Sequence, residues 1–285
     1  MAVIHFPQWQ GGNPQLRADR GAASMRSFLA SLAPEVEREI VEIPVETGED
    51  LPVERGVAGL SAILRQLGAA GWAIQTLAPA RLALLGGDCS IEIAAVPYLL
   101  ERYGEGLAAL WIDAHGDLNT PEISPSHRLH GMPLRTLLGE GDPELVALGK
   151  PSRGSGLRPE QVATAGVRDL DPGELDYLDQ HPAIRRFSVA EVETGPEPLV
   201  EALRAGGFSQ VHVHLDLDAI DPADFPHTAC PTPNGLRIDA LMRLLRALDS
   251  SFDLVGLCLT ECTAPTPREV EPLRPLLELF AQVGA

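Results

Sequence analysis

The 285-residue sequence contains a single lysine, Lys150, and carries a net charge of −18 at pH 7. Phosphate backbones and anionic lipid headgroups repel so acidic a chain, which excludes nucleic acids and membrane surfaces as expected partners. No apolar run approaches the roughly 20 residues that a membrane-spanning helix needs. The first residues, MAVIHFPQWQ, also lack the basic start and the long apolar core of a secretory signal peptide.

Cysteine is scarce as well, and the four residues, Cys89, Cys230, Cys258 and Cys262, show no paired framework. Disulfide-rich secreted proteins carry a regular cysteine pattern, which is missing here. Together with the absence of a signal-peptide pattern, this predicts a cytoplasmic protein. Cys258 and Cys262 fall within or just after an apolar run and are expected to be buried. Cys230 is expected in a loop, TACPTP.

Short apolar runs alternate with amphipathic segments along most of the chain. Strands that alternate with helices favour right-handed crossovers and a mainly parallel sheet, so we predict an α/β fold. Because the motifs described below are spread over most of the chain, we expect residues 1–285 to form one domain. Strands are predicted at 3–6, 82–85, 107–113, 161–167, 211–218 and 254–261, and helices at 56–71, 91–104, 198–207 and 238–248.

Potential metal ligands stand at the ends of three of these apolar runs. Carboxylates are costly to bury at the tips of parallel strands unless their charge is compensated. We therefore expect a metal site at the carboxyl ends of the strands, where open α/β sheets bind their ligands. The candidates are Cys89 in LALLGGDCS, Asp113, His115 and Asp117 in LWIDAHGDLNTP, and Asp216 and Asp218 in VHVHLDLDAIDP.

The spacings D-x-H-x-D and D-x-D place alternate side chains on one side of an extended chain. The ligands of the second run share a side if extended geometry continues past the strand end. His212 and His214 share the face of Asp216 and can hold the ligands in place by hydrogen bonding. So many donors exceed the needs of one ion and suit two divalent ions about 3.5–4 Å apart. The donor types are compatible with Mn²⁺, Zn²⁺, Fe²⁺ or Co²⁺.

Six segments of the sequence resemble motifs of the ureohydrolase superfamily of arginases and agmatinases, and they occur in the same order as in that superfamily. They are GGDCS, WIDAHGDLNTP, LHGMPL, GVRDLDPGE, HLDLDAIDP and LTECTAP, between about residue 80 and about residue 265. The resemblance implies a single-domain, three-layer α/β/α fold with a mainly parallel sheet. It also implies two Mn²⁺ ions. Asp113 and Asp216 would bind both ions, Cys89 and Asp117 would complete one site, and His115 and Asp218 would complete the other.

The same resemblance implies catalytic roles for three residues. Water activated by the metal ions would attack the guanidinium carbon of a small substrate. His130 in LHGMPL matches a proton-shuttling histidine, and Asp218 also handles protons. Glu261 in LTECTAP matches the glutamate that pairs with the substrate guanidinium.

The loop with Asn119 and Ser126 matches, in spacing, the arginase loop that binds the carboxylate of an amino acid. Asp171 in RDLDPGE matches the residue that faces the α-amino group. Judged by the residues alone, Asn119 and Ser126 fit ordinary turn chemistry equally well. Asp171 also fits a helix N-cap before Pro172.

Cys89 departs from the family pattern, which reads GGDHS at this place. A thiolate is a softer donor than an imidazole and leans toward Zn²⁺ or Fe²⁺. Together with the H-x-D-x-D spacing, the cysteine resembles the N-omega-hydroxy-L-arginine amidinohydrolase branch of the superfamily. The alternative is a buried, inert thiol beside a weakly filled metal site.

Three functions are therefore open. We favour a hydrolase that converts L-arginine or N-omega-hydroxy-L-arginine to ornithine plus urea or hydroxyurea. The second is an agmatinase-like hydrolase of a decarboxylated guanidine, and the third is a non-catalytic binding or regulatory protein. Either a monomer or a homo-oligomer is compatible with the sequence.

Overall fold

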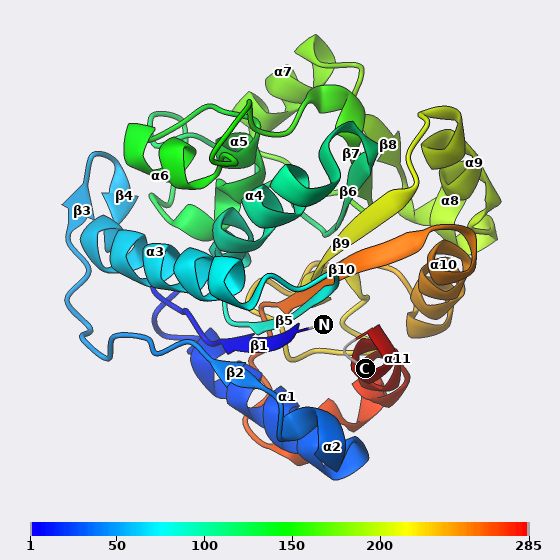
Figure 1. Ribbon diagram of the computed structural model, residues 1–285, viewed down its shortest axis with the longest axis horizontal. Coiled ribbons are helices and arrows are strands. Elements are labelled where there is room, and N and C mark those ends of the chain that lie inside the picture. The colour runs from blue at the N-terminus through cyan, green and yellow to red at the C-terminus, as the bar shows by residue number, and fades with distance from the viewer. Residues whose placement is uncertain (1, 284–285) are drawn as a thin grey trace.

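Figure 1 shows the computed structural model, which describes residues 2–283. Its centre is an eight-stranded sheet in which every neighbouring pair of strands is parallel. The predicted α/β class with a mainly parallel sheet is confirmed. In sheet order the strands are β2 (Val41–Glu42), β1 (Ala2–Phe6), β5 (Leu82–Gly86), β10 (Asp253–Thr260), β9 (Gln210–Asp216), β6 (Leu107–Ile112), β7 (Val162–Ala165) and β8 (Arg185–Phe187).

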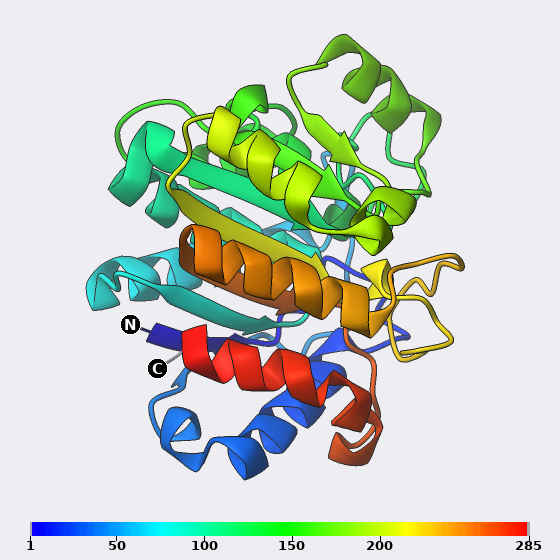
Figure 2. The ribbon, with the colours of Figure 1, turned by 90° about the vertical axis from the view of Figure 1, so that its right-hand side faces the viewer.

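Helices cover both faces of the sheet, and Figure 2 looks onto one of these layers. The central strands are therefore buried on both sides, which explains why they form nearly continuous apolar runs. No helix within residues 2–283 combines the length and apolar character needed to cross a membrane. One face carries α1 (Ala18–Leu32), α2 (Pro34–Glu37), α8 (Val189–Thr194), α9 (Glu197–Ala205), α10 (Ile238–Ser251) and α11 (Arg274–Val283), and the other carries α3 (Leu60–Leu77), α4 (Glu92–Tyr103), α5 (Pro133–Leu137), α6 (Pro143–Leu148) and α7 (Pro172–Gln180).

The short elements escaped prediction. The edge strands β2 and β8 have two and three residues, too few for a periodic pattern. The antiparallel hairpin of β3 (Val53–Glu54) and β4 (Val57–Ala58) occupies the start of the segment predicted as a helix from residue 56. That boundary was wrong. The helix α3 begins only after Gly59, whose φ of 69° is left-handed.

The strand order brings four strand ends together. β5, β10, β9 and β6 are adjacent in the sheet although they are far apart in the sequence. Since parallel strands end at the same edge, the residues that follow them meet there. Cys89 follows β5, Glu261 follows β10, Asp216 ends β9, and Asp113 follows β6.

Two glycines inside helices allow a matched test of how packing affects the stability of the fold. A Cβ atom at Gly21 in α1 would lie 1.9 Å from the carbonyl oxygen of Cys262, whereas one at Gly68 in α3 would meet no described residue within 4 Å. Gly21→Ala is expected to lower the free energy of unfolding by about 1–3 kcal/mol through overpacking. Gly68→Ala is expected to raise it by about 0.5–1 kcal/mol through helix propensity. Urea denaturation of both variants checks this, and effects of the same sign would contradict it.

Candidate metal centre

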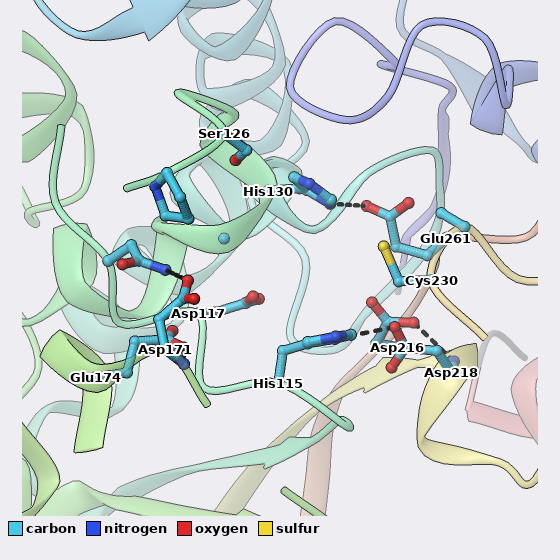
Figure 3. A pocket seen from close by; sticks show the side chains of 14 residues that line it. His115, Asp117, Ser126, His130, Asp171, Glu174, Asp216, Asp218, Cys230 and Glu261 are labelled. Atoms are coloured by element: carbon cyan, nitrogen blue, oxygen red, sulfur yellow. Dashed lines mark hydrogen bonds and ion pairs between the residues drawn. The ribbon is translucent and has the colours of Figure 1, made fainter. Parts of the chain in front are cut away.

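The four strand ends border a cavity of about 230 Å³, which Figure 3 shows from close by. All but two of the site residues predicted from the sequence line this cavity. The exceptions, Cys89 and Asp113, are buried, with 1% and 0% of their surface exposed. The predicted site residues that line it are His115, Asp117, Asn119, Ser126, His130, Asp171, Asp216, Asp218 and Glu261.

One cluster of candidate ligands forms around Cys89. The Sγ atom of Cys89 lies 3.1 Å from Oδ2 of Asp216. Four residues each offer one potential ligand atom here, and these four atoms lie within 4.8 Å of one another: Cys89, Asp113, Asp117 and His214. Cys89 follows β5, Asp113 and Asp117 follow β6, and His214 lies within β9, so the sheet itself positions these donors.

A second cluster lies beside the first. It consists of Asp113, His115 and Asp218, whose ligand atoms also lie within 4.8 Å of one another. His115 Nδ1 is 3.1 Å from Asp218 Oδ2 and 3.5 Å from Asp113 Oδ1. Asp113 belongs to both clusters. A carboxylate shared by two sets of ligands suits two neighbouring cations.

The chain does not stay extended after β6, so the condition under which Asp113, His115 and Asp117 would share one side is not met. β6 ends at Ile112, and Asp117 adopts a φ of 54°, which non-glycine residues rarely occupy. The resulting turn brings Asp117 into the Cys89 cluster and leaves His115 in the other. There the Oδ2 of Asp117 accepts a hydrogen bond of 3.2 Å from Trp111 Nε1.

Three aspartates of the cavity, Asp117, Asp216 and Asp218, have too little positive charge around them. Burial, reinforced by neighbouring carboxylates, raises the pKa values of Asp117 and Asp216 well above their usual range. Burial and the charge of Asp113 likewise raise the pKa of Asp218 to about 6. The Oδ2 of Asp113 is buried and has no hydrogen-bond partner among residues 2–283. Carboxylates, an imidazole and a thiol therefore fit two divalent cations, which would let these groups ionise together.

Glu261 and His130 approach each other at the edge of the cavity, as Figure 3 shows. Oε1 of Glu261 accepts a hydrogen bond of 3.2 Å from the backbone N–H of Cys89 and lies 3.3 Å from His130 Nδ1. Burial disfavours the imidazolium, but the hydrogen bond and charge of Glu261 outweigh burial and raise the pKa of His130. Glu261 has a φ of 62°, and such strain recurs at functional sites. The pair offers the cavity a carboxylate for a cationic group and a proton donor.

Asp171 lies on the opposite side of the cavity from Glu261 in Figure 3. Its Oδ2 accepts a hydrogen bond of 2.9 Å from Asn119 Nδ2. Asp171 is also the N-cap residue of α7, and its backbone N–H donates to the Glu174 carboxylate at 2.9 Å. Ser126 accepts a hydrogen bond of 3.2 Å from the backbone N–H of Arg128. These residues thus serve local turns and also line the cavity, so the two interpretations drawn from the sequence are compatible.

Sequence reasoning missed Glu92, a fully buried carboxylate on α4. Its oxygens accept hydrogen bonds of 2.9 Å from His212 Nε2 and 3.0 Å from His214 Nδ1. Within residues 2–283 neither histidine has a side-chain hydrogen bond to a candidate carboxylate ligand, and His214 Nε2 lies 3.7 Å from Asp113 Oδ2. Their support of the ligands stays a prediction. An acidic residue within the apolar stretch IEIAAVPYLL was the signal that could have revealed Glu92.

Cys230 is another residue whose place the sequence did not reveal. It is half-buried and lines the cavity beside Glu261. Burial and the Glu261 charge raise the pKa of the Cys230 thiol to about 11. The other three cysteines, Cys89, Cys258 and Cys262, are buried. Cys230 is therefore the thiol that a cavity ligand would touch.

Comparison with known proteins assigns this chain to a family. The family model described as the Arginase family matches residues 1–269. The chain belongs to the arginase family. An arginase from Bacillus caldovelox is 36% identical over 241 residues, which cover 79% of this chain and 78% of that protein. An arginase from Staphylococcus aureus strain MRSA252 is 37% identical over 183 residues, or 62% of this chain, and the match spans only 59% of that relative's length.

A solved structure agrees with the family assignment. The native structure of Bacillus caldovelox arginase at pH 5.6 matches with a TM-score of 0.85 and 27% identity, covering 100% of this chain and 98% of that chain. The sequence resemblance to the ureohydrolase superfamily and the three-layer fold that it implied are confirmed.

Proposed function

We propose that this protein uses two divalent cations to hydrolyse the guanidino group of L-arginine or N-omega-hydroxy-L-arginine, which yields ornithine plus urea or hydroxyurea. The observation that carries the proposal is the pair of ligand clusters that share Asp113 beside a cavity. The relatives from Bacillus caldovelox and Staphylococcus aureus, both named arginase, support it. Four cysteines that all carry free thiols fit a reducing compartment, the cytoplasm.

Each of the two clusters would bind one cation. Asp113 and Asp216 would bind both ions. Cations bound here would act as Lewis acids and make a nucleophilic water available near neutral pH. We propose Mn²⁺ at both positions, while the Cys89 thiolate also accommodates Zn²⁺, Fe²⁺ or Co²⁺. The remaining ligands are Cys89 and Asp117 for one ion and His115 and Asp218 for the other.

The walls of the cavity would orient the substrate and move protons. The Glu261 carboxylate, 2% exposed, would pair with the guanidinium, since a charged hydrogen bond is strong where water is excluded. Hydrolysis forms a C–O bond at the guanidinium carbon and breaks the bond from that carbon to the leaving nitrogen. His130, close to Glu261, would supply the proton that this nitrogen needs. Asp218 would accept a proton from the attacking water.

The other end of the cavity would bind the α-amino and α-carboxylate groups of the substrate. Asp171 presents a carboxylate to an α-amino group, and Asn119 and Ser126 present polar groups to an α-carboxylate. The hydrogen bond from Asn119 to Asp171 keeps the two side chains together. The substrate would thus be held at both ends, with its guanidinium beside the clusters.

Agmatine, which lacks the carboxylate, is therefore expected to be a poor substrate. A hydrogen bond to a charged group contributes about 1.5–3 kcal/mol, so its loss lowers kcat/KM roughly tenfold or more. The test compares initial rates on L-arginine, N-omega-hydroxy-L-arginine and agmatine at equal, subsaturating concentration with added Mn²⁺. A higher rate on agmatine than on both amino acids would replace this proposal by the agmatinase-like alternative. No turnover by a protein that binds two ions would favour the non-catalytic one.

A further inference from the structure

We propose that His214 is itself a ligand of the cation held by Cys89, so that each cluster contains one imidazole donor. The second cluster has His115, and the Cys89 cluster would have His214, contributed by β9. This inference rests on the proposed function, because it concerns the same pair of cations. Three observations on His214 support it.

The first observation concerns two buried atoms that face each other without partners. His214 Nε2 and Asp113 Oδ2 are both buried, and neither atom has a hydrogen-bond partner in the part of the chain that the structure describes. They lie 3.7 Å apart, too far for a hydrogen bond between them. Two atoms that each lie about 2.1 Å from one cation are roughly 3–4 Å apart. A cation would satisfy both atoms at the separation that they already have.

The second observation concerns the other nitrogen of the ring. His214 Nδ1 donates its proton to Glu92 Oε1 at 3.0 Å. In this tautomer the lone pair of Nε2 points toward Asp113. Histidines that bind metals commonly donate their second N–H to a carboxylate, which sets the tautomer and strengthens the donor. Glu92 therefore holds His214 in the tautomer whose Nε2 can bind a cation.

The third observation is that the ring of His214 is fixed in place. It stacks on Trp111, with ring centroids 3.8 Å apart and an interplanar angle of 21°. The same Trp111 donates its indole N–H to Asp117, another residue of the Cys89 cluster. One tryptophan thus positions two members of the cluster, and little conformational entropy remains to be lost when a cation binds.

His212 provides a matched control. It lies on the same face of β9, is fully buried, and donates from Nε2 to the same Glu92. Within residues 2–283 it belongs to none of the clusters that offer ligands to a metal. A variant at His212 therefore disturbs the same buried network without removing a ligand.

The test uses two variants that each keep a donor to Glu92. In His214→Asn the amide nitrogen stands near the position of ring Nδ1, and the Nε2 ligand is lost. In His212→Gln the amide nitrogen stands near the position of ring Nε2. The full chain is stripped with a chelator and reloaded with Co²⁺. Bound metal per chain is then counted, and the near-ultraviolet band of thiolate-bound Co²⁺ reports on the Cys89 position.

The expected result is that the unaltered chain and His212→Gln bind two Co²⁺ ions and show the thiolate band. His214→Asn should bind the ion at Cys89 at least tenfold more weakly, with a diminished band, and keep the other ion. Two ions held by His214→Asn with unchanged affinity and band would overturn the inference and leave the proposed function standing. Equal losses in both variants would also overturn it. Absence of Co²⁺ from the unaltered chain would overturn the proposed function as well.

A measurement without substitutions covers the case in which His214→Asn does not fold. A crystal structure of the unaltered protein loaded with Mn²⁺ should place His214 Nε2 about 2.0–2.3 Å from the ion beside Cys89. A separation beyond 3 Å, with Asp113 hydrogen-bonded to the ring, would show that His214 only positions Asp113.

Discussion

Asp113→Asn is expected to abolish hydrolysis and to weaken the binding of both cations, because Asp113 is the residue that the two clusters share. Asparagine keeps the side-chain oxygen that accepts the 2.7 Å hydrogen bond from the His115 backbone, but it loses the charge. Without the ions several kcal/mol of Lewis-acid stabilisation are lost, so kcat/KM should fall by about three orders of magnitude or more. Bound Mn²⁺ per chain and the rate of ornithine formation measure the two effects.

Asp169 supplies the control. Its carboxylate lies 3.9 Å from His115 Nε2 but its side chain is 68% exposed, so solvent already compensates its charge. Asp169→Asn should keep both ions and most of the activity. His115 outweighs burial and lowers the pKa of Asp113, so the Asp113 charge stabilises the metal-free fold. The metal-free Asp113→Asn variant should therefore melt lower than the unaltered metal-free chain, and the melt also shows whether it is folded at the assay temperature. Two firmly bound ions in Asp113→Asn would show that the clusters do not share this carboxylate.

Glu261→Gln is expected to lose activity while it keeps both cations. The substitution preserves the shape of the side chain but leaves a buried guanidinium without its counter-charge. Breaking a buried ion pair costs about 3–5 kcal/mol, so kcat/KM should fall by roughly two to four orders of magnitude. Steady-state kinetics, together with metal content and a thermal melt, separate this outcome from loss of metal or of fold.

The control for Glu261 is an acidic residue of the same cavity with a structural role. Glu174 accepts backbone N–H groups from Leu118 and Asp171, so Glu174→Gln should preserve one acceptor and change kcat/KM only several-fold. A Glu261→Gln variant with a rate near that of the unaltered protein would contradict the role proposed for Glu261. Loss of a cation from it would show instead that Glu261 is a ligand, which its place beside Cys89 and Asp216 permits.

The convergence of the strand ends was predictable because it depends on regular elements. Buried parallel strands are apolar throughout, so a carboxylate such as Asp216 at the end of one stands out in the sequence. The alternation within β9 also correctly placed Val213 and His214 on opposite faces. The ligand roles, by contrast, came from the family resemblance, and they stay predictions until metal binding is measured.

What was missed depends on contacts between distant segments. Glu92 lies on a helix, and only the packing of α4 against β9 shows that it bonds two histidines. The left-handed turn at Asp117 left no distinctive pattern in the sequence, because its conformation is imposed by its surroundings. Cys230 sits in a long loop whose path no periodicity describes, so its place in the cavity could be seen only in the folded chain.

The most direct test is a titration of metal-stripped protein with Mn²⁺. At each step two quantities are measured: bound Mn²⁺ per chain, and the rate of ornithine release from L-arginine and from N-omega-hydroxy-L-arginine. We predict no turnover without metal, and a rate on at least one of the two substrates that rises with bound Mn²⁺ and levels off at two ions per chain. Turnover by the stripped protein, or a chain that binds two ions and releases ornithine from neither substrate, would contradict the claim that this cavity is a two-cation guanidino hydrolase site.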